Sequence, residues 1–406
     1  MTTAPELERV TVATNRGFSF NVYVQGNLAE RHQKTVILTV HDLGTNHNSF
    51  ARFVAHPAMQ KVRENAVFLH VCVPGQEDHA PDFVGDYPLL KDIGESLVCV
   101  LDQYDIKTCV AFGEGSGANI ICRFAMSHPN RLIGVCLIHC TSTTAGLIEY
   151  CKDKAPSECD VEQITNIQLT NMRLESGVMS QGAWDYLTMH KLGAVSPVFH
   201  TVGTPVSTCM YTHTHASESH DLRRLSALIS RVACATAHDD LQDSDKAVKA
   251  AYIENLRATL NPRNLSKYLL SFTKRTDLSQ MIGEKLVTVD VLLVSGAKAP
   301  HLQTVYTTQK SMNKAKTTLL VVNNVCDVMQ EAPDNLARSL ILLCKGCGVL
   351  AGVSIPGMDR QRTLSKHYSS MEEADRPRRV SLTPSQGSNG SGAVSPPPVA
   401  PAAAVA

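Results

Sequence analysis

The sequence lacks an excess of charge of either sign, a long apolar run and a secretory signal. Lysine plus arginine and aspartate plus glutamate both number 38 in 406 residues, so overall charge gives no basis for binding nucleic acid. No uncharged apolar stretch reaches the roughly 18 residues of a membrane-spanning helix. The opening MTTAPELERV has neither the basic nor the apolar part of a secretory signal. These absences predict a cytoplasmic protein with no nucleic-acid partner.

The composition that is present suits a large folded core. Hydrophobic residues make up 43% of the chain, which is typical of globular domains. The cysteines number 13, an odd count, and several lie inside apolar runs. Buried, reduced thiols in a cytoplasmic protein explain this usage best.

The order of apolar segments predicts an α/β fold. Residues 9–25 alternate around Asn15-Arg16-Gly17 and indicate a β-hairpin. The later strands are continuous apolar runs, which is typical of parallel strands covered by helices on both faces. They are residues 35–40, 66–73, 108–112, 132–139, 289–294 and 317–322. Helical periodicity covers 86–104, 116–128 and about 334–343. We therefore expect a mostly parallel, eight-stranded sheet.

Composition also divides the chain. Residues 8–140 and 287–350 are assigned to the α/β core, and residues 141–286 to a helical cap over the carboxyl ends of the strands, where ligand sites lie in such sheets. Within the cap, 197–245 is polar and is interpreted as a long loop. Residues 351–406 are rich in Arg, Ser, Pro and Gly and are predicted to be a disordered tail.

The segment 108–128, TCVAFGEGSGANIICRFAMSH, has the strand, glycine-rich turn and helix of a G-x-S-x-G nucleophile elbow. In that frame Gly113 and Gly117 are the flanking glycines, and Gly115 stands where the nucleophilic serine should be. Using Ser116 instead would put Glu114 where the strand and helix cross and only a small residue fits. We therefore interpret Ser116 as a capping residue of the helix.

The other two positions of a Ser–acid–His triad are also empty of catalytic side chains. After residues 289–294 the acid position holds Ala299, and nearby His301 is out of triad order and is interpreted as a surface residue. After 317–322 the base position holds Asn324. Cys326 lies close by, but this loop has no imidazole to activate a thiol. Three losses together predict that hydrolysis has been abandoned.

A polar pocket is the other candidate site, formed by His41, Asp42, Glu114 and Ser116. His41 and Asp42 begin the loop that would supply an oxyanion-hole N–H. The alternative is that both residues cap the strand end and tie it to neighbouring loops, and we favour it because an oxyanion hole without a nucleophile stabilises no acyl transition state.

These residues together resemble the N-myc downstream-regulated family, as an invertebrate-like and divergent member. The resemblance rests on stretches within residues 8–350, which are ILTVHDLGTNH, GEGSGANIICRFAMSHPNRLIGVCLI, GAWDYLTMHKLG, NPRNLSKYLLSFTKRTDL and VDVLLVSGAKAPHLQTV. It implies an α/β-hydrolase fold without hydrolase activity. It also implies cytoplasmic roles in signalling, differentiation, stress response and vesicle trafficking, with association with lipids or other proteins. The 197–245 insertion departs from the compact cap of that family.

The tail contains two motifs for basophilic kinases. Arg360-Gln361-Arg362-Thr363-Leu364-Ser365 fits R-x-R-x-x-S, and Arg378-Arg379-Val380-Ser381 fits R-R-x-S. The first resembles the family's sites for serum- and glucocorticoid-induced kinase, and the second resembles protein kinase A sites. Phosphorylation at Ser365 or Ser381 would add about −1.5 to −2 charges to a basic segment.

Weaker motifs give no cofactor or metal site. The histidines of HTHASESH (213–220) lack a partner at metal-ligand spacing. Cys344 and Cys347 form a lone C-x-x-C at a helix end and are interpreted as structural. Trp184 fits core packing of a cap helix, and the glycines at 113, 115 and 117 do not have the dinucleotide-binding spacing.

Three functions remain open. The first is a non-enzymatic adaptor or signalling protein with a phosphorylated tail, whose partners are other proteins and, at the tail, basophilic kinases. The second is a residual hydrolase that uses Ser116 or Cys326. The third is a sensor of a lipid, membrane surface or small molecule that keeps the old pocket.

Overall fold

The computed structural model describes residues 7–144, 174–179, 181–192, 250, 252–254, 256 and 259–356. The predicted loop 197–245, the histidines of HTHASESH and the tail serines Ser365 and Ser381 lie outside these residues. Contacts between Cα atoms group Met1–Asp359 into one unit and Arg360–Ala406 into another. Within the described part of the chain, no helix is both long enough and apolar enough to cross a membrane.

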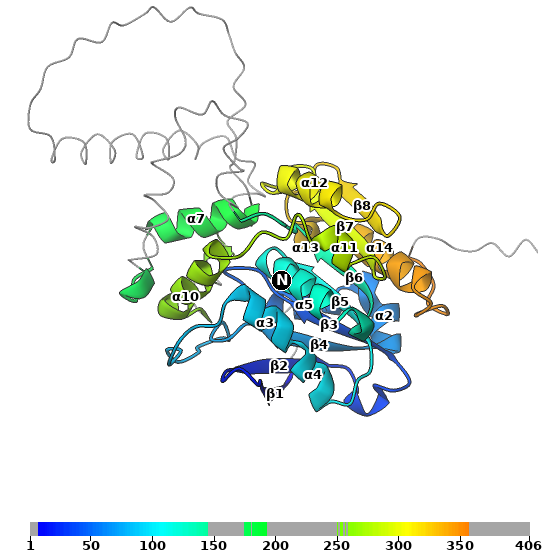
Figure 1. The fold of residues 1–406 in the computed structure, drawn as a ribbon, viewed down its shortest axis with the longest axis horizontal. Helices are drawn as coiled ribbons and strands as arrows, with labels where there is room; N and C mark the ends of the chain where they lie inside the picture. Colours follow the sequence, from blue (N-terminus) through cyan, green and yellow to red (C-terminus); the bar gives the residue numbers. More distant parts are fainter. Residues whose placement is uncertain are drawn as a thin grey trace, which may run out of the picture. The chain divides into compact units, whose positions relative to one another are not determined.

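The core is an eight-stranded sheet in the order β1-β2-β4-β3-β5-β6-β7-β8 (Figure 1). The first two strands form an antiparallel hairpin, β2 is antiparallel to β4, and all later pairs are parallel. The strands are β1 Glu8–Ala13, β2 Ser19–Gln25, β3 Thr35–Val40, β4 Ala66–Cys72, β5 Cys109–Glu114, β6 Leu132–Ile138, β7 Asp290–Gly296 and β8 Thr317–Val322. The predicted α/β-hydrolase-like, mostly parallel sheet is confirmed.

Helices cover both faces of this sheet, which explains the unbroken apolar runs. Every residue of β4 and of β5 is buried. One apolar cluster joins the sheet to α3, α4, α5, α7, α10, α11 and α12, and a second joins it to α1, α2, α13 and α14. Burial on both faces leaves no position for the polar residues that would alternate along an exposed strand.

Two of the three predicted helices, over 116–128 and about 334–343, are found close to their expected bounds. The α-helices are α1 His47–Ala55, α2 Gln60–Asn65, α3 Leu90–Ser96, α4 Val98–Gln103, α5 Ser116–Ser127, α7 Gln181–Leu192, α10 Pro262–Thr273, α11 Ile282–Lys285, α12 Leu302–Ser311, α13 Val328–Glu331 and α14 Pro333–Gly346. Within the described residues, three short 3₁₀ helices lie at Leu28–Glu30, Pro57–Met59 and Pro129–Arg131.

Two boundaries differ from the sequence-based prediction. The helix expected over 86–104 begins only at Leu90, because a residue before proline, here Tyr87 before Pro88, disfavours helical backbone. A turn at Leu97 divides it into α3 and α4. At the other end, Val353 is only 4% exposed in the second apolar cluster. The packed core therefore continues past residue 350, where we expected the tail to begin.

The crossing of β5 and α5 explains two of the three elbow glycines. A Cβ on Gly113 would lie 2.7 Å from the Cα of Ala118, and a Cβ on Gly117 would lie 2.2 Å from the carbonyl oxygen of Val40. Real side chains do not tolerate backbone contacts this short. The small residues at these positions keep the close approach of strand and helix that a nucleophile elbow requires.

Candidate functional site: a degenerate nucleophile elbow

The third elbow glycine, Gly115, keeps the backbone conformation of the turn but has no room for a side chain. Its φ is +53° and its ψ is −115°, a conformation that L-residues rarely adopt. A Cβ at this position would lie 2.1 Å from both Cγ and Oδ1 of Asp42. The Asp42 carboxylate therefore fills the space where a nucleophilic serine would begin.

The same carboxylate accepts hydrogen bonds from two backbone amides. Asp42 Oδ1 accepts from the N–H of Leu43 at 2.7 Å and from the N–H of Ser116 at 2.8 Å. The oxyanion hole of an α/β-hydrolase consists of the N–H after the nucleophile and an N–H from the loop after β3. Ser116 and Leu43 occupy these two positions. An aspartate of the chain itself thus lies where a reacting carbonyl oxygen would bind.

His41 has a structural role, as favoured from the sequence. Its Nδ1 donates to the carbonyl oxygen of Asp42 at 2.8 Å, and its Nε2 accepts from the N–H of Val73 at 3.0 Å. Burial lowers the pKa of His41 to about 4, so the ring is neutral and can accept at Nε2. The imidazole joins the end of β3 to the loop that follows β4.

Ser116 does not cap α5, contrary to the prediction. Gly115 is the N-cap residue and makes no side-chain capping bond. The hydroxyl of Ser116 instead contacts the hydroxyl of Tyr268 on α10, and Tyr268 is in turn 3.4 Å from the carbonyl oxygen of His41. Among the described residues, the printed contact of the serine hydroxyl is with this phenol and not with an imidazole that could take its proton as a nucleophile requires.

The cap helix α7 inserts two basic residues into the site. His190 Nε2 lies 3.2 Å from Oδ1 and 3.1 Å from Oδ2 of Asp42. The next residue, Lys191, pairs with Glu114 and lies 3.3 Å from Oδ2 of Asp327. These five side chains are all at most 8% exposed. We call them the α7 latch, because they join the last turn of α7 to the ends of β3 and β5 and to the loop after β8.

The electrostatics of the latch favour ionised Asp42 and Lys191. Burial alone would raise the pKa of Asp42, but the charge of His190 and its hydrogen bond, with Lys191 close by, hold that pKa below its ordinary value. Burial alone would lower the pKa of Lys191, but Asp327, Glu114 and Asp42 together raise it. Pairing thus compensates the cost of burying these charges.

The acid and base positions of the lost triad contain no catalytic side chain. Ala299 is buried at 6% exposure after β7, and Asn324 is exposed in a turn with φ +60° after β8. His301 is not a free surface residue as we expected: its Nε2 is 3.0 Å from the carbonyl oxygen of His190. Cys326 Sγ lies 2.7 Å from the carbonyl oxygen of Leu192. Both loops therefore hold the carboxyl end of α7.

The sequence pattern identified His41, Asp42, Glu114 and Ser116 as neighbours of the elbow, and the structure brings all four to it. The pattern missed His190, Lys191, Tyr268 and Asp327. A charged pair in an otherwise apolar helix end, as in LTMHKLG, is the one signal that could have indicated His190 and Lys191. Asp327 caps α13 by accepting from two backbone amides.

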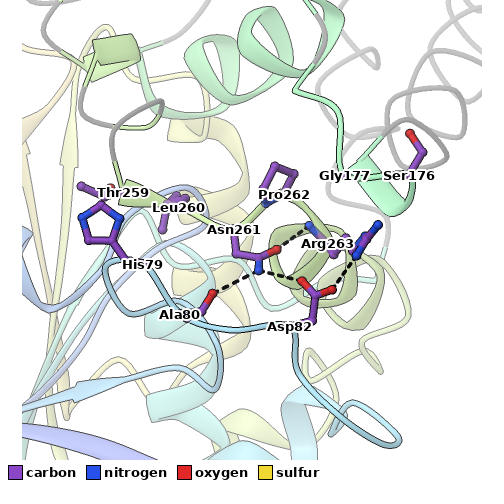
Figure 2. A pocket seen from close by; sticks show the side chains of 10 residues that line it. All are labelled: His79, Ala80, Asp82, Ser176, Gly177, Thr259, Leu260, Asn261, Pro262 and Arg263. Carbon is purple, nitrogen blue, oxygen red and sulfur yellow. Dashed lines mark hydrogen bonds and ion pairs between the residues drawn. The ribbon is translucent and has the colours of Figure 1, made fainter.

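A separate surface pocket of about 420 Å³ lies between the loop after β4 and the start of α10. Figure 2 shows Asn261 and Arg263 of this pocket both bonded to Asp82. The bond from Arg263 Nη1 to Asp82 Oδ2 is 2.6 Å, so the two charges neutralise each other. No triad position and no latch residue is among the ten that line it.

The weaker motifs find structural explanations. Trp184 is 6% exposed in the first apolar cluster, as predicted. Cys344 is buried and Cys347 half-buried, and the sulfur of Cys347 lies 2.7 Å from where a Cβ on Gly134 would be. In the part of the chain that the structure covers, no three His, Cys, Asp or Glu side chains are arranged to hold a metal ion.

Solved structures with this fold include enzymes. MenH from S. aureus superposes with a TM-score of 0.53 and 11% identity, over 81% of this chain and 98% of that one. A thermophilic esterase from Thermogutta terrifontis gives a TM-score of 0.53 and 9% identity, over 84% and 99% of the two chains. At such low identity the likeness establishes the α/β-hydrolase fold and nothing about activity.

Sequence comparison defines the family. The model of the Ndr family matches residues 9–232 and 226–351. A Caenorhabditis elegans protein described as uncharacterized is 57% identical over 377 residues, which is 93% of this chain and 95% of that protein. Protein NDRG2 of Homo sapiens is 24% identical over 358 residues, 87% of this chain and 79% of the relative. The resemblance found in the sequence is confirmed, and the chain belongs to the Ndr family as a divergent member.

Proposed function

We propose that this protein is a non-enzymatic adaptor or signalling protein of the cytoplasm, built on an α/β-hydrolase scaffold that has lost its chemistry. The observation that carries the proposal is the position of the Asp42 carboxylate, which accepts from the amides of Leu43 and Ser116. Roles in signalling, stress response, differentiation or vesicle trafficking follow from family membership. The partners we propose are other proteins.

The physical reason is that these two amides are already occupied by a full negative charge. An oxyanion hole accelerates acyl transfer only when its donors are free to bind the oxygen on which charge develops. Asp42 is 3% exposed and also pairs with His190. Displacing it would leave a buried carboxylate without partners, at a cost of about 3–5 kcal/mol. A substrate carbonyl, which is uncharged in the ground state, cannot compete for this position.

The C-terminal tail is proposed as the regulated part of the molecule. Ser365 and Ser381 lie in basophilic kinase motifs, and a phosphate at either site would introduce negative charge among arginines. This change would alter contacts between the tail and a partner or a membrane surface. The purified full-length chain should incorporate phosphate when it is incubated with basophilic kinases. Ser365→Ala and Ser381→Ala should each remove the phosphate of its own site. Unchanged incorporation in the double variant would reject both sites.

Loss of catalysis is tested by covalent probes on the full-length chain. A fluorophosphonate and a thiol-reactive probe, each with a panel of generic esters, should give neither saturable labelling nor turnover. Ser116→Ala and Cys326→Ala are the matched controls, because these two residues are the candidate nucleophiles of a residual hydrolase. Turnover that disappears in one of these variants would establish a residual hydrolase and overturn the proposal.

A sensor that uses the old pocket is the remaining alternative. Stabilisation of the folded chain by a ligand grows with its concentration relative to its dissociation constant. Thermal unfolding with fatty-acyl and phosphoinositide ligands should therefore show no concentration-dependent shift if Asp42, His190 and Lys191 fill the site permanently. A saturable shift that Asp42→Asn alters would favour the sensor instead.

A further inference from the structure

The α7 latch has an unbalanced set of ionisable groups. Its three carboxyl groups, Asp42, Glu114 and Asp327, come from the core, whereas the two basic groups, His190 and Lys191, come from the cap helix. All of them are at most 8% exposed. Because an unpaired buried charge is costly, the cluster is least strained when one carboxyl group carries a proton.

Glu114 is the carboxyl group that the geometry selects for this proton. It is 0% exposed, and its Oε1 contacts Lys191 while its Oε2 has no hydrogen-bond partner among the described residues. Asp42, by contrast, accepts from two amides and from His190. Asp327 also has an oxygen, Oδ2, without a hydrogen bond among the described residues, but this oxygen lies 3.3 Å from Lys191 Nζ and its Oδ1 accepts from two amides of α13. A neutral acid tolerates an unpartnered oxygen at lower cost than a carboxylate does.

The electrostatic surroundings agree with this assignment. Burial raises the pKa of Glu114, the charge of Lys191 partly opposes that rise, and the charges of Asp327 and Asp42 add to it, so that the pKa reaches about 7. The ordinary value is 4.5. Glu114 therefore changes its charge near neutral pH in the docked state.

The other ionisable groups around the cluster keep their charge state between pH 5.5 and 8. Burial lowers the pKa of His139 to about 3 and that of His301 to about 4, so both rings are neutral. Burial also raises the pKa of Cys326 to about 12 and raises that of Tyr252. The guanidinium carbon of Arg275 lies 4.0 Å from the centroid of the Phe272 ring. The side chains of His139, His301, Cys326 and Tyr252 therefore do not change charge in the pH range in which Glu114 does.

We propose that the α7 latch is a proton-dependent switch, in which the proton on Glu114 keeps the last turn of α7 docked and its loss loosens that turn. The device belongs to the interface between cap and core and does not depend on whether the protein is an adaptor. His190 contacts Asp42, so a substitution at Glu114 leaves the pair of His190 and Asp42 in place.

The direction and size of the effect follow from linkage. Glu114 has a raised pKa when α7 is docked, so its contribution to docking is complete below about pH 4.5 and is lost as the pH rises through about 7. Asp42 has the opposite shift and acts only at strongly acidic pH. Between pH 5.5 and 8, the opening equilibrium constant of α7 should rise roughly 20-fold and then become constant.

Hydrogen exchange of the full-length chain measures this opening directly. Protection factors, which correct for the intrinsic pH dependence of exchange, are compared for α7 and for β5 at pH 5.5, 6.5, 7.5 and 8.5. The α7 protection factor should fall with rising pH while that of β5 changes less. In Glu114→Gln, which mimics the protonated acid, the α7 protection factor should be high and independent of pH.

Glu77→Gln is the matched control. Glu77 is another buried glutamate whose pKa is raised by burial, and its Oε1 accepts from Asn21 on β2. This variant should keep the pH dependence of α7. The proposal is overturned if α7 and β5 lose protection in parallel at every pH, or if Glu114→Gln and Glu77→Gln behave alike.

Should Glu114→Gln fail to fold, the carboxyl ¹³C titration of Glu114 in the unmodified chain decides: a midpoint near 7 supports the switch and one below 5 overturns it.

Discussion

A side chain at Gly115 should destabilise the fold mainly through its collision with Asp42. In Gly115→Ala, the new Cβ would be placed 2.1 Å from the Asp42 carboxylate, so that carboxylate must leave its two amide donors and His190. Hydrogen bonds to a charged group contribute about 1.5–3 kcal/mol each, and the strained backbone at φ +53° adds about 1–2 kcal/mol for a non-glycine residue. Partial relaxation leaves an expected loss of about 3–5 kcal/mol in the free energy of unfolding.

A double-mutant cycle separates the collision from the backbone strain. In an Asp42→Gly background, the same Gly115→Ala substitution should cost only about 1–2 kcal/mol, since the carboxylate is no longer there to be displaced. The coupling energy between the two sites is therefore about 2–3 kcal/mol. Urea denaturation of the full-length chain at pH 7, with fluorescence and circular dichroism followed together, gives the four free energies.

The control is Gly85→Ala, at a glycine with φ +88° and nothing within 4 Å of the added Cβ. It measures the cost of a positive φ alone, expected at about 1 kcal/mol, and should not couple to Asp42. The reasoning is refuted if Gly115→Ala costs no more than Gly85→Ala, or if the Gly115 and Asp42 substitutions are additive.

Three further outcomes are expected. Asp42→Asn should lower the free energy of unfolding by about 3–5 kcal/mol at pH 7. Because the pKa of Asp42 is depressed in the folded state, the carboxylate's contribution is lost as the pH falls below about 3.8, so the melting temperature of the variant should decline less steeply in acid than that of the unmodified chain. An equally steep decline in both would contradict the pairing. Phe112→Ala removes an edge-to-face contact with Phe50, whose ring centroid is 4.8 Å away. It should lower the free energy of unfolding by about 3–5 kcal/mol in urea denaturation. A loss under 1 kcal/mol would mean that the second apolar cluster repacks to fill the cavity. Ser116→Ala removes the hydroxyl that contacts Tyr268 and leaves the phenol only the carbonyl oxygen of His41, at 3.4 Å. It should lower the free energy of unfolding by about 1–2 kcal/mol by the same measurement. A stabilised variant would show that the hydroxyl contact is unfavourable.

The sheet was predictable because its determinants are local. Continuous apolar runs such as TVILTV and AVFLHVC identify strands buried on both faces, and the resulting order of strands with helices leaves few topologies. The glycines at 113, 115 and 117 also identified the elbow, since each spacing has a steric cause that can be read from a motif.

The contents of the site were less predictable because they depend on contacts between distant segments. Asp42 and His190 are 148 residues apart in the chain, and no periodicity in either segment relates them. Ser116 looked like a capping residue because serine is common there, but it bonds to Tyr268, which lies 152 residues away. The tertiary partner in this case overrides the local preference.

The carboxylate of Asp42 also constrains the history of this lineage. An ancestor with serine at position 115 had no space for a carboxylate within 2.3 Å of that serine's Cβ, so the loss of the serine must have come before, or together with, the arrival of Asp42 in its present place. Serine at position 115 alone now meets a steric barrier from Asp42, and a complete triad would also need new side chains at the positions of Ala299 and Asn324. No single substitution at position 115 can therefore rebuild the elbow around a serine while Asp42 keeps its present place.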